Sequence, residues 1–192
     1  MMSGTRVLRR QQATRERIVR CAMELFLEQG FEDTTVAQIT EAADIGKGTF
    51  FTYFPTKQDV LSFLGEQVMA VMAQADQRDS SARDRLERVF GAAGEWYDTN
   101  EAAARQMVLS RLSALRQRHS LAREQLSQLV AEIVAAGHDR GQFPNIDVET
   151  ATTLVLASYF AAIVQWAWEP GRTAHDRLIS QLQLALRALE TS

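Results

Sequence analysis

Apolar residues recur along this chain every three or four positions, the spacing that predicts amphipathic helices. The first such stripe comprises Ile18, Ala22, Leu25 and Phe26, and it predicts a helix from about Thr14 to Gln29 that ends at a glycine. No segment alternates apolar and polar residues convincingly as a half-buried strand does. The three prolines, at positions 55, 144 and 170, lie where predicted helices stop. The pattern therefore predicts an all-α protein.

Two short helices are predicted next. Thr35 and Gln38 have the spacing of a capping box, which predicts the start of the first of them. A turn of about three residues ends it, and a second helix follows from Lys47 to Tyr53, before Pro55. Two short helices joined by a tight turn are typical of a helix-turn-helix, although the spacing alone also fits a plain helical hairpin.

The residues of the second short helix favour the DNA-binding interpretation. Lys47 at its start can reach a guanine edge, and Gly48 leaves room for close approach of the backbone. Thr49 and Tyr53 lie four residues apart, so their hydroxyls share one face and suit phosphate contacts. Phe50 and Phe54 are predicted core residues, whereas Phe51 and Tyr53 are the candidates for exposure.

A fourth helix is predicted from Thr56, its candidate cap, to about Gln74, and a polar loop follows it. Five more helices are predicted around residues 86–97, 102–118, 126–137, 148–168 and 173–190. We place the boundary between a helix-turn-helix head and a helical body inside the fourth helix. The predicted units are residues 1–60 and 61–192.

The formal net charge of −3 on 192 residues argues against a nucleic-acid partner, but the distribution of charge argues for one. Arginines cluster near the start of the chain, opposed there only by Glu16; they are Arg6, Arg9, Arg10, Arg15, Arg17 and Arg20. A basic N-terminal arm is predicted, and residues 6–10 of it could reach a neighbouring minor groove. A solvated, frayed tail is the alternative.

Residues 150–168 carry no charge, and their number fits a membrane span. The segment nevertheless contains three threonines, a serine, a glutamine and many alanines. We therefore interpret it as a helix buried between the core and a partner subunit, and expect no membrane. Cys21 is the single cysteine, which excludes a disulfide framework and fits the cytoplasm.

The runs 34–39, 42–43 and 46–57 resemble the signature of TetR-family repressors, and the likeness extends over roughly residues 14–64. The order and spacing of many positions agree. Phe51 departs from the family, which usually has tyrosine there, and could contact a thymine methyl instead. Asp44 stands where glycine is usual, and aspartate tolerates the left-handed conformation that the turn requires.

The resemblance implies roles for particular residues and a dimeric assembly. The family positions that hold DNA phosphates match Thr35, Thr49, Tyr53 and Lys57. The family positions that face bases match Lys47, Gly48 and Phe51. The family also implies a homodimer through the last two helices, which binds a near-palindromic double-stranded operator. The sequence also supports a homodimer directly, because a monomer would expose apolar surface. This surface comprises the uncharged segment 150–168 and two residues off the main stripe of the last helix, Ile179 and Leu184.

The family further implies that an unknown small molecule, largely apolar, binds inside the body and releases the DNA. The candidate lining residues are Trp96, Met107, Leu112, Tyr159, Phe160, Ile163 and Trp166. Each of them could equally be an ordinary core residue.

No catalytic or metal-binding pattern stands out in the sequence. His119, His138 and His175 are far apart, and no metal-ligand spacing or paired carboxylates appear, so neither cofactor nor enzymatic activity is expected. The predicted function is a DNA-binding transcriptional repressor. The alternative is a helical small-molecule-binding protein or enzyme without DNA binding, which would lack the steep salt dependence of DNA binding.

Overall fold

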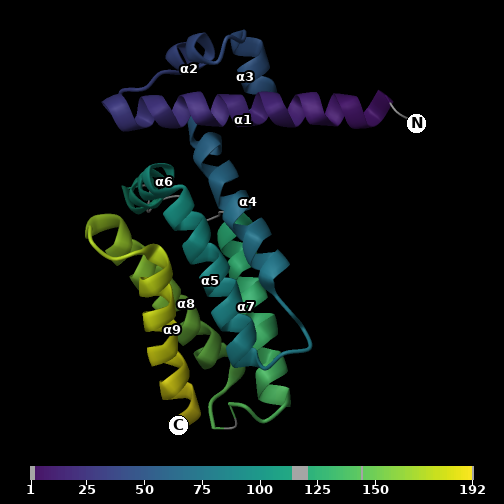
Figure 1. Ribbon diagram of the computed structural model, residues 1–192, viewed down its shortest axis with the longest axis vertical. Helices are drawn as coiled ribbons and strands as arrows, with labels where there is room; N and C mark the ends of the chain where they lie inside the picture. The colour runs from purple at the N-terminus through teal and green to yellow at the C-terminus, as the bar shows by residue number, and fades with distance from the viewer. Residues whose placement is uncertain (1–2, 114–120, 144, 192) are drawn as a thin grey trace. The chain divides into compact units, whose positions relative to one another are not determined.

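The computed structural model describes residues 3–113, 121–143 and 145–191, and over these ranges it contains nine α-helices and no strand (Figure 1). The predicted all-α fold is confirmed. The chain divides into two compact units, residues 1–64 and 65–192. The division falls inside α4 (Lys57–Ala75), the helix in which the sequence analysis placed the boundary near residue 60.

The first unit comprises α1 (Ser3–Gln29), α2 (Val36–Ala42), α3 (Lys47–Tyr53) and the beginning of α4. Its core is apolar and partly aromatic, and it is built from buried side chains of all four helices. Phe26 and Phe31 meet edge to face with 4.9 Å between ring centroids, so the chain after α1 folds back onto that helix. The fully buried residues of this core include Ile18, Ala22, Phe26, Ile39, Phe50, Phe54 and Val60.

The start of α1 differs from the prediction. The helix begins at Ser3 rather than near Thr14, so residues 6–10 are helical and do not form an extended arm. Thr14 lies inside this helix, and its hydroxyl donates to the carbonyl of Arg10 at 3.0 Å. Arginine, leucine and glutamine are good helix formers, and no glycine or proline interrupts residues 6–13. These turns have no buried stripe, and hydrophobic periodicity therefore did not detect them.

The second unit contains α5 (Ala82–Thr99), α6 (Glu101–Ser113), α7 (Leu121–Asp139), α8 (Val148–Trp168) and α9 (Ala174–Thr191). Figure 1 shows α5, α7, α8 and α9 running side by side, with α9 against both α5 and α8, and α8 against both α6 and α7. The core between them is almost entirely apolar. This arrangement leaves α8 and α9 adjacent along their lengths.

Helix starts in the second unit are held by side chains. The Asp147 carboxylate accepts the backbone N–H of Thr150 at 2.9 Å and thereby caps α8. Asp98, from the end of α5, accepts the N–H groups of Ala174 and His175 at 2.7 and 3.1 Å and thereby caps α9. A Cβ on Gly94 would lie 2.4 Å from the Cα of His175, so α5 and α9 can approach this closely only with glycine there.

Helix α8, in which residues 150–168 carry no charge, was predicted to be buried on all sides, with one of those sides against a partner. Within the chain, one face of it is buried, and 44% of its most apolar stretch is buried overall. Among the described residues, α8 is the one helix long and apolar enough to cross a membrane, with a mean hydropathy of 1.3. Its outer face carries Phe160 and Trp168, which are 38% and 67% exposed.

Candidate nucleic-acid interface

Helices α2 and α3 are joined by the four residues Ala43 to Gly46. Asp44 has a φ of 48°, the left-handed conformation expected of it. The backbone N–H of Asp44 donates to the carbonyl of Glu41 at 3.1 Å, and that of Ile45 donates to Thr40 at 3.0 Å. These two hydrogen bonds hold the turn against the end of α2, and this sets the direction in which α3 leaves it.

The beginning of α2 is held by the predicted capping box. The Thr35 hydroxyl accepts the Gln38 N–H at 3.2 Å, and the Gln38 side chain accepts the Thr35 N–H at 2.8 Å. Gln38 also donates to Gln29 at 3.4 Å, and Gln29 donates to the hydroxyl of Thr34 at 3.2 Å. This network ties α2 to the end of α1 and leaves Thr35 on the surface.

One side of α3 is buried and the other side is free. Phe50 is fully buried, and its ring packs against those of Phe51 and Phe54 at centroid distances of 5.5 and 5.9 Å. Phe51 nevertheless remains 51% exposed, and Tyr53 is half-buried. The predicted division of these aromatic residues between core and surface is thus what the structure has.

The two glycines at the start of α3 face open space. A Cβ added to Gly46 or to Gly48 would have no heavy atom within 4 Å. Gly46 has a φ of −75°, which any residue adopts, and Gly48 lies within the helix. Neither the packing nor the backbone conformation of this chain requires glycine at these two positions. Lys47 and Thr49 beside them are exposed as well.

Lys57 is oriented differently from the other candidate DNA-binding residues. Its ammonium group donates to three backbone carbonyls of the segment between α1 and α2: that of Phe31, that of Thr34 at 2.8 Å and that of Glu32 at 3.2 Å. It also lies 4.3 Å from the centroid of the Phe31 ring. All three of its N–H donors are therefore used inside the protein.

Six of the seven candidates lie on α3 or at the start of α2, and all of them except the half-buried Tyr53 are exposed. These residues are Thr35, Lys47, Gly48, Thr49, Phe51 and Tyr53. The seventh candidate, Lys57, differs from them because its side chain points toward the loop after α1.

The candidate effector-binding residues of the second unit are less uniform. Met107, Tyr159, Ile163 and Trp166 are buried in its core. Trp96 is half-buried, and Phe160 is 38% exposed on the outer face of α8, one residue and about 100° of helix away from buried Tyr159. Leu112 belongs to α6, but its side chain lies outside the described part of the chain.

Sequence reasoning did not identify the polar centre of this core. Tyr97 and Tyr159 are both 4% exposed, and their hydroxyl oxygens lie 3.1 Å apart in a hydrogen bond. The Tyr97 ring packs on Trp166 at 5.6 Å, and the Tyr159 ring packs on Phe90 at 5.2 Å. A hydrogen bond across 62 positions of sequence leaves no local signal.

Two arginines of the second unit also have roles that the sequence did not suggest. Arg105 donates to the carbonyl of Trp166 and, at 3.1 Å, to that of Ala167, so it caps the end of α8. Arg85 forms two hydrogen bonds with the Asp76 carboxylate, at 2.7 and 2.8 Å, and both side chains are buried. The guanidinium of Arg85 holds the pKa of Asp76 below its ordinary value, and Asp76 raises the pKa of Arg85.

The outside of this unit carries a polar groove of about 560 Å³ between the end of α4, α5 and the start of α9. Its lining includes Asp84, Glu87, Arg88, Glu95 and His175. The groove is open to solvent and carries four charged side chains, so its chemistry does not match a buried apolar effector. No group of three or more potential metal ligands is present among the described residues.

Comparison with known proteins places this geometry in a family. A family model for bacterial regulatory proteins of the tetR family matches residues 18–62, from the middle of α1 into α4. The structure of FadR from Thermus thermophilus, a TetR-family transcriptional repressor in complex with lauroyl-CoA, is 31% identical to this chain. The likeness covers 90% of this chain and 93% of that one, with a TM-score of 0.61. The chain belongs to the TetR family.

Other relatives agree with this assignment. The transcriptional regulator TcmR of Streptomyces glaucescens is 41% identical over 68 residues, which span 33% of this chain and 30% of that protein. The fatty acid metabolism regulator protein of Bacillus subtilis is 24% identical over 78% of this chain and 81% of that protein. This TetR-family protein is therefore a DNA-binding transcriptional regulator, and the comparisons do not support the alternative without DNA binding.

Proposed function

We propose that this TetR-family protein is a homodimeric repressor that inserts α3 into the major groove of a near-palindromic operator. The observation that carries this proposal is the open space around Gly46 and Gly48. Glycine inside a helix costs about 0.5–1 kcal/mol relative to alanine. Nothing within the chain requires glycine at these two positions. The close approach of a surface outside the chain therefore explains best why they carry no side chain.

The individual contacts follow from the chemistry of the exposed residues. Lys47, at the start of α3, donates to a guanine edge, and Phe51 packs on a thymine methyl. The hydroxyls of Thr35, Thr49 and Tyr53 donate to phosphates on either side of the groove. Base contacts of this kind set the sequence preference, whereas phosphate contacts set the register.

The outer face of α8 is the proposed dimer interface. It carries the apolar side chains Phe160 and Trp168, and Leu184 of the adjacent α9 is 56% exposed. These side chains would be covered by the same face of a second copy. Ile179, which the sequence also suggested, would contribute less, because its Cδ1 lies within 4.0 Å of the position a Cβ on Gly91 in α5 would take.

For the effector we propose a long-chain acyl-CoA. Support comes from the 31% identical Thermus FadR, whose structure holds lauroyl-CoA. The buried side chains of Met107, Ile163 and Trp166 offer an apolar lining, and the Tyr97–Tyr159 hydroxyl pair offers polar partners for a thioester carbonyl. These side chains are buried in the core, so an acyl chain would have to displace some of them, and the flexible Met107 is suited to that.

The place of action follows from the partner. A protein that binds chromosomal DNA in a bacterium works in the cytoplasm, and we propose no enzymatic activity for it. Its effect on transcription is that of a switch, because an effector with higher affinity for the DNA-free arrangement shifts the protein away from the operator.

The proposed function is tested by selecting duplexes from a random-sequence library and measuring fluorescence anisotropy. The purified protein is expected to select a near-palindrome and to prefer it over random duplex by at least about 10³-fold at physiological salt. Lauroyl-CoA is expected to release the labelled operator, whereas free coenzyme A is not. Failure to enrich any sequence would contradict DNA reading by α3, and enrichment without release by lauroyl-CoA would contradict only the effector.

A further inference from the structure

Five arginines lie on a single face of α1. At 100° per residue, they fall within an arc of about 100°, on the side opposite the buried residues Ile18 and Ala22. All five are exposed, and from first to last they extend along about 21 Å of helix, at 1.5 Å per residue. We name this set the arginine stripe: Arg6, Arg9, Arg10, Arg17 and Arg20.

The charge of the arginine stripe is not neutralised within the described part of the chain. No ion pair joins any of its five guanidinium groups to a carboxylate among the described side chains. Glu16, the nearest acidic residue in the sequence, accepts a hydrogen bond from Gln12 at 2.8 Å. The stripe therefore presents an uncompensated line of positive charge.

The position of the stripe does not favour helix stability. Backbone dipoles make the N-terminal end of a helix positive, so acidic residues there are stabilising and basic residues are not. The first turn of α1 contains no acidic residue, and three arginines occur within the first eight positions of the helix. A bound polyanion would offset this unfavourable arrangement, because its charge is opposite to both the stripe and the helix terminus.

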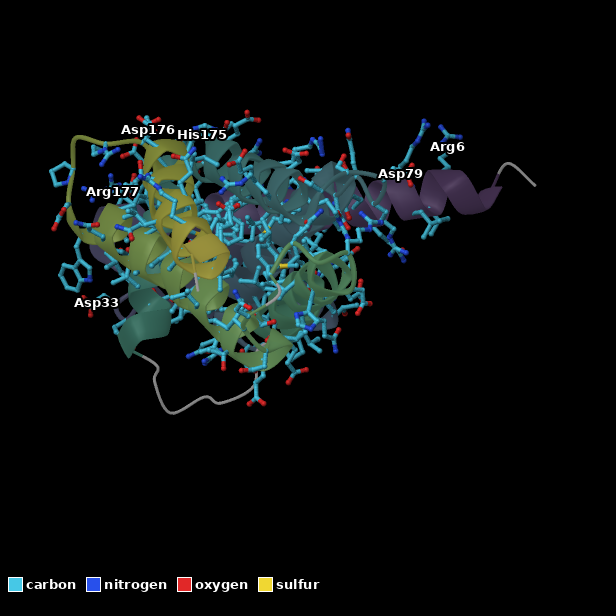
Figure 2. The ribbon with its side chains drawn as sticks, turned by 90° about the horizontal axis from the view of Figure 1, so that it is seen from below. Arg6, Asp33, Asp79, His175, Asp176 and Arg177 are labelled. Carbon is cyan, nitrogen blue, oxygen red and sulfur yellow. The ribbon has the colours of Figure 1, made fainter. Side chains whose placement is uncertain are left out.

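The first turns of α1 extend past α3 within the same unit (Figure 1). The Arg6 side chain projects away from the helix near its free end (Figure 2). Val7 and Leu8, on other faces of these turns, are 51% and 66% exposed, so no core holds this part of the helix. The N-terminal half of the stripe thus reaches beyond the two helices of the helix-turn-helix.

We propose that the arginine stripe is a second DNA-binding surface, which holds phosphates of the duplex beside the segment that α3 reads. This inference rests on the proposed operator binding by α3. A stripe of about 21 Å spans about six base pairs at 3.4 Å per step, which is enough for several phosphates of one strand. Arginine suits this role because its planar guanidinium donates two parallel hydrogen bonds to a phosphate. The contacts carry affinity without sequence preference.

The test compares the parent protein with the variant Arg6→Gln/Arg9→Gln/Arg10→Gln on two duplexes. One is the selected operator trimmed to its conserved core, and the other is the same core with ten base pairs of random sequence on each side. Glutamine keeps the helix propensity of arginine and removes its charge. Circular dichroism and sedimentation are expected to be the same for both proteins.

We expect the parent to bind the flanked duplex more tightly than the trimmed one, and the variant to lose that advantage. Each phosphate contact that is lost lowers the slope of log K against log salt by about 0.9, so three contacts in each of the two heads lower it by about 5.4. The affinity advantage of the parent on the flanked duplex then falls about 40-fold per head, or about 1,800-fold for the dimer, between 50 and 200 mM salt. The ranking of operator sequences is expected to stay the same.

The matched control is Arg78→Gln/Arg140→Gln/Arg172→Gln, which removes the same charge from exposed positions of the second unit. Equal losses in both triple variants would overturn the proposal, because net charge alone would then explain them. Equal binding of the flanked duplex by parent and variant, with the core still bound, would overturn it while leaving the proposed function intact. If the parent selects no DNA sequence at all, both the proposed function and the inference about the arginine stripe are wrong.

A basic helix with exposed Val7 and Leu8 could instead bind an anionic membrane. Vesicles of phosphatidylglycerol and phosphatidylcholine are therefore included, with phosphatidylcholine alone as control. We expect no vesicle binding that depends on the stripe. Binding to phosphatidylglycerol that the triple variant loses, with unchanged binding to the flanked duplex, would overturn the assignment to DNA.

Discussion

The replacement Lys57→Met tests whether this lysine positions the DNA-binding unit or contacts DNA itself. Its family position suggests a phosphate contact, but its ammonium group donates to the carbonyls of Phe31, Glu32 and Thr34. Methionine keeps an apolar stem over the Phe31 ring and removes the charge. The two roles predict different results, because a positioning residue affects stability and a phosphate contact affects the salt dependence of binding.

The size of the stability effect follows from the contacts. A hydrogen bond to a charged group contributes about 1.5–3 kcal/mol. Lys57 and the carbonyls are partly exposed, and water can replace part of what is lost. The total is therefore closer to one such bond than to three, and we expect the first unit to lose about 2–3 kcal/mol of stability.

The assay must report on the first unit specifically. All three tryptophans, at positions 96, 166 and 168, lie in the second unit, so tryptophan fluorescence does not follow the first. Hydrogen exchange of peptides covering residues 30–45 is suitable, and it is expected to accelerate by about 30- to 150-fold, as 2–3 kcal/mol of destabilisation implies. The matched control is Gln58→Met, at the neighbouring exposed position of α4.

The salt dependence of operator binding then separates the two roles. With Lys57 as a positioning residue, the slope of log K against log salt stays at the parental value, and any loss of affinity is the same at every salt concentration. If the variant instead lowers the slope of log K against log salt by about 0.9 per head and leaves hydrogen exchange unchanged, the reasoning is refuted. Lys57 would then be a phosphate contact.

Three further predictions concern the start of α3, the buried Asp76–Arg85 ion pair and the outer face of α8. Gly48→Ala is expected to stabilise the free protein by about 0.5–1 kcal/mol and yet weaken operator binding at least tenfold; tighter binding would contradict close approach of DNA. Asp76→Asn leaves Arg85 buried without its partner and is expected to cost about 3–5 kcal/mol at pH 7, followed by tryptophan fluorescence in urea. Because the folded-state pKa of Asp76 is lowered, its stabilisation is present above its ordinary pKa and is lost as pH falls through the lowered one, so the variant should show a flatter decline in acid. Phe160→Glu is expected to give monomers in sedimentation experiments, whereas Leu121→Glu, which also changes an exposed apolar residue, is not; a dimeric Phe160→Glu protein would exclude this interface.

Features that depend on neighbouring residues in the chain could be predicted from the sequence. The Thr35–Gln38 capping box, the left-handed Asp44 and the Asp147 cap each involve residues no more than a few positions apart. The division of the α3 aromatic residues between core and surface follows from helical phase in the same way. These local rules located the two short helices and their turn, and the resemblance to TetR-family repressors identified them as a helix-turn-helix.

Features that depend on contacts across the chain could not be predicted. The Lys57 contacts with the loop after α1 join residues at least 23 positions apart, and the Arg105 cap on α8 joins residues 61 or more apart. The tyrosine pair and the Asp98 cap on α9 are of the same kind. The early start of α1 was missed for another reason, since an exposed helix has no apolar stripe to detect.

The central claim is that the exposed start of α3 reads the operator, and Lys47→Ala tests it most directly. The measurement is the affinity for the selected operator and for each single-base variant of one half-site, with Arg78→Ala as a control from the second unit. The account predicts that Lys47→Ala loses about 1–3 kcal/mol of discrimination at one base position, while the other positions and the control keep theirs. Unchanged discrimination at every position would contradict base reading by Lys47 and, with it, the placement of α3 in the major groove.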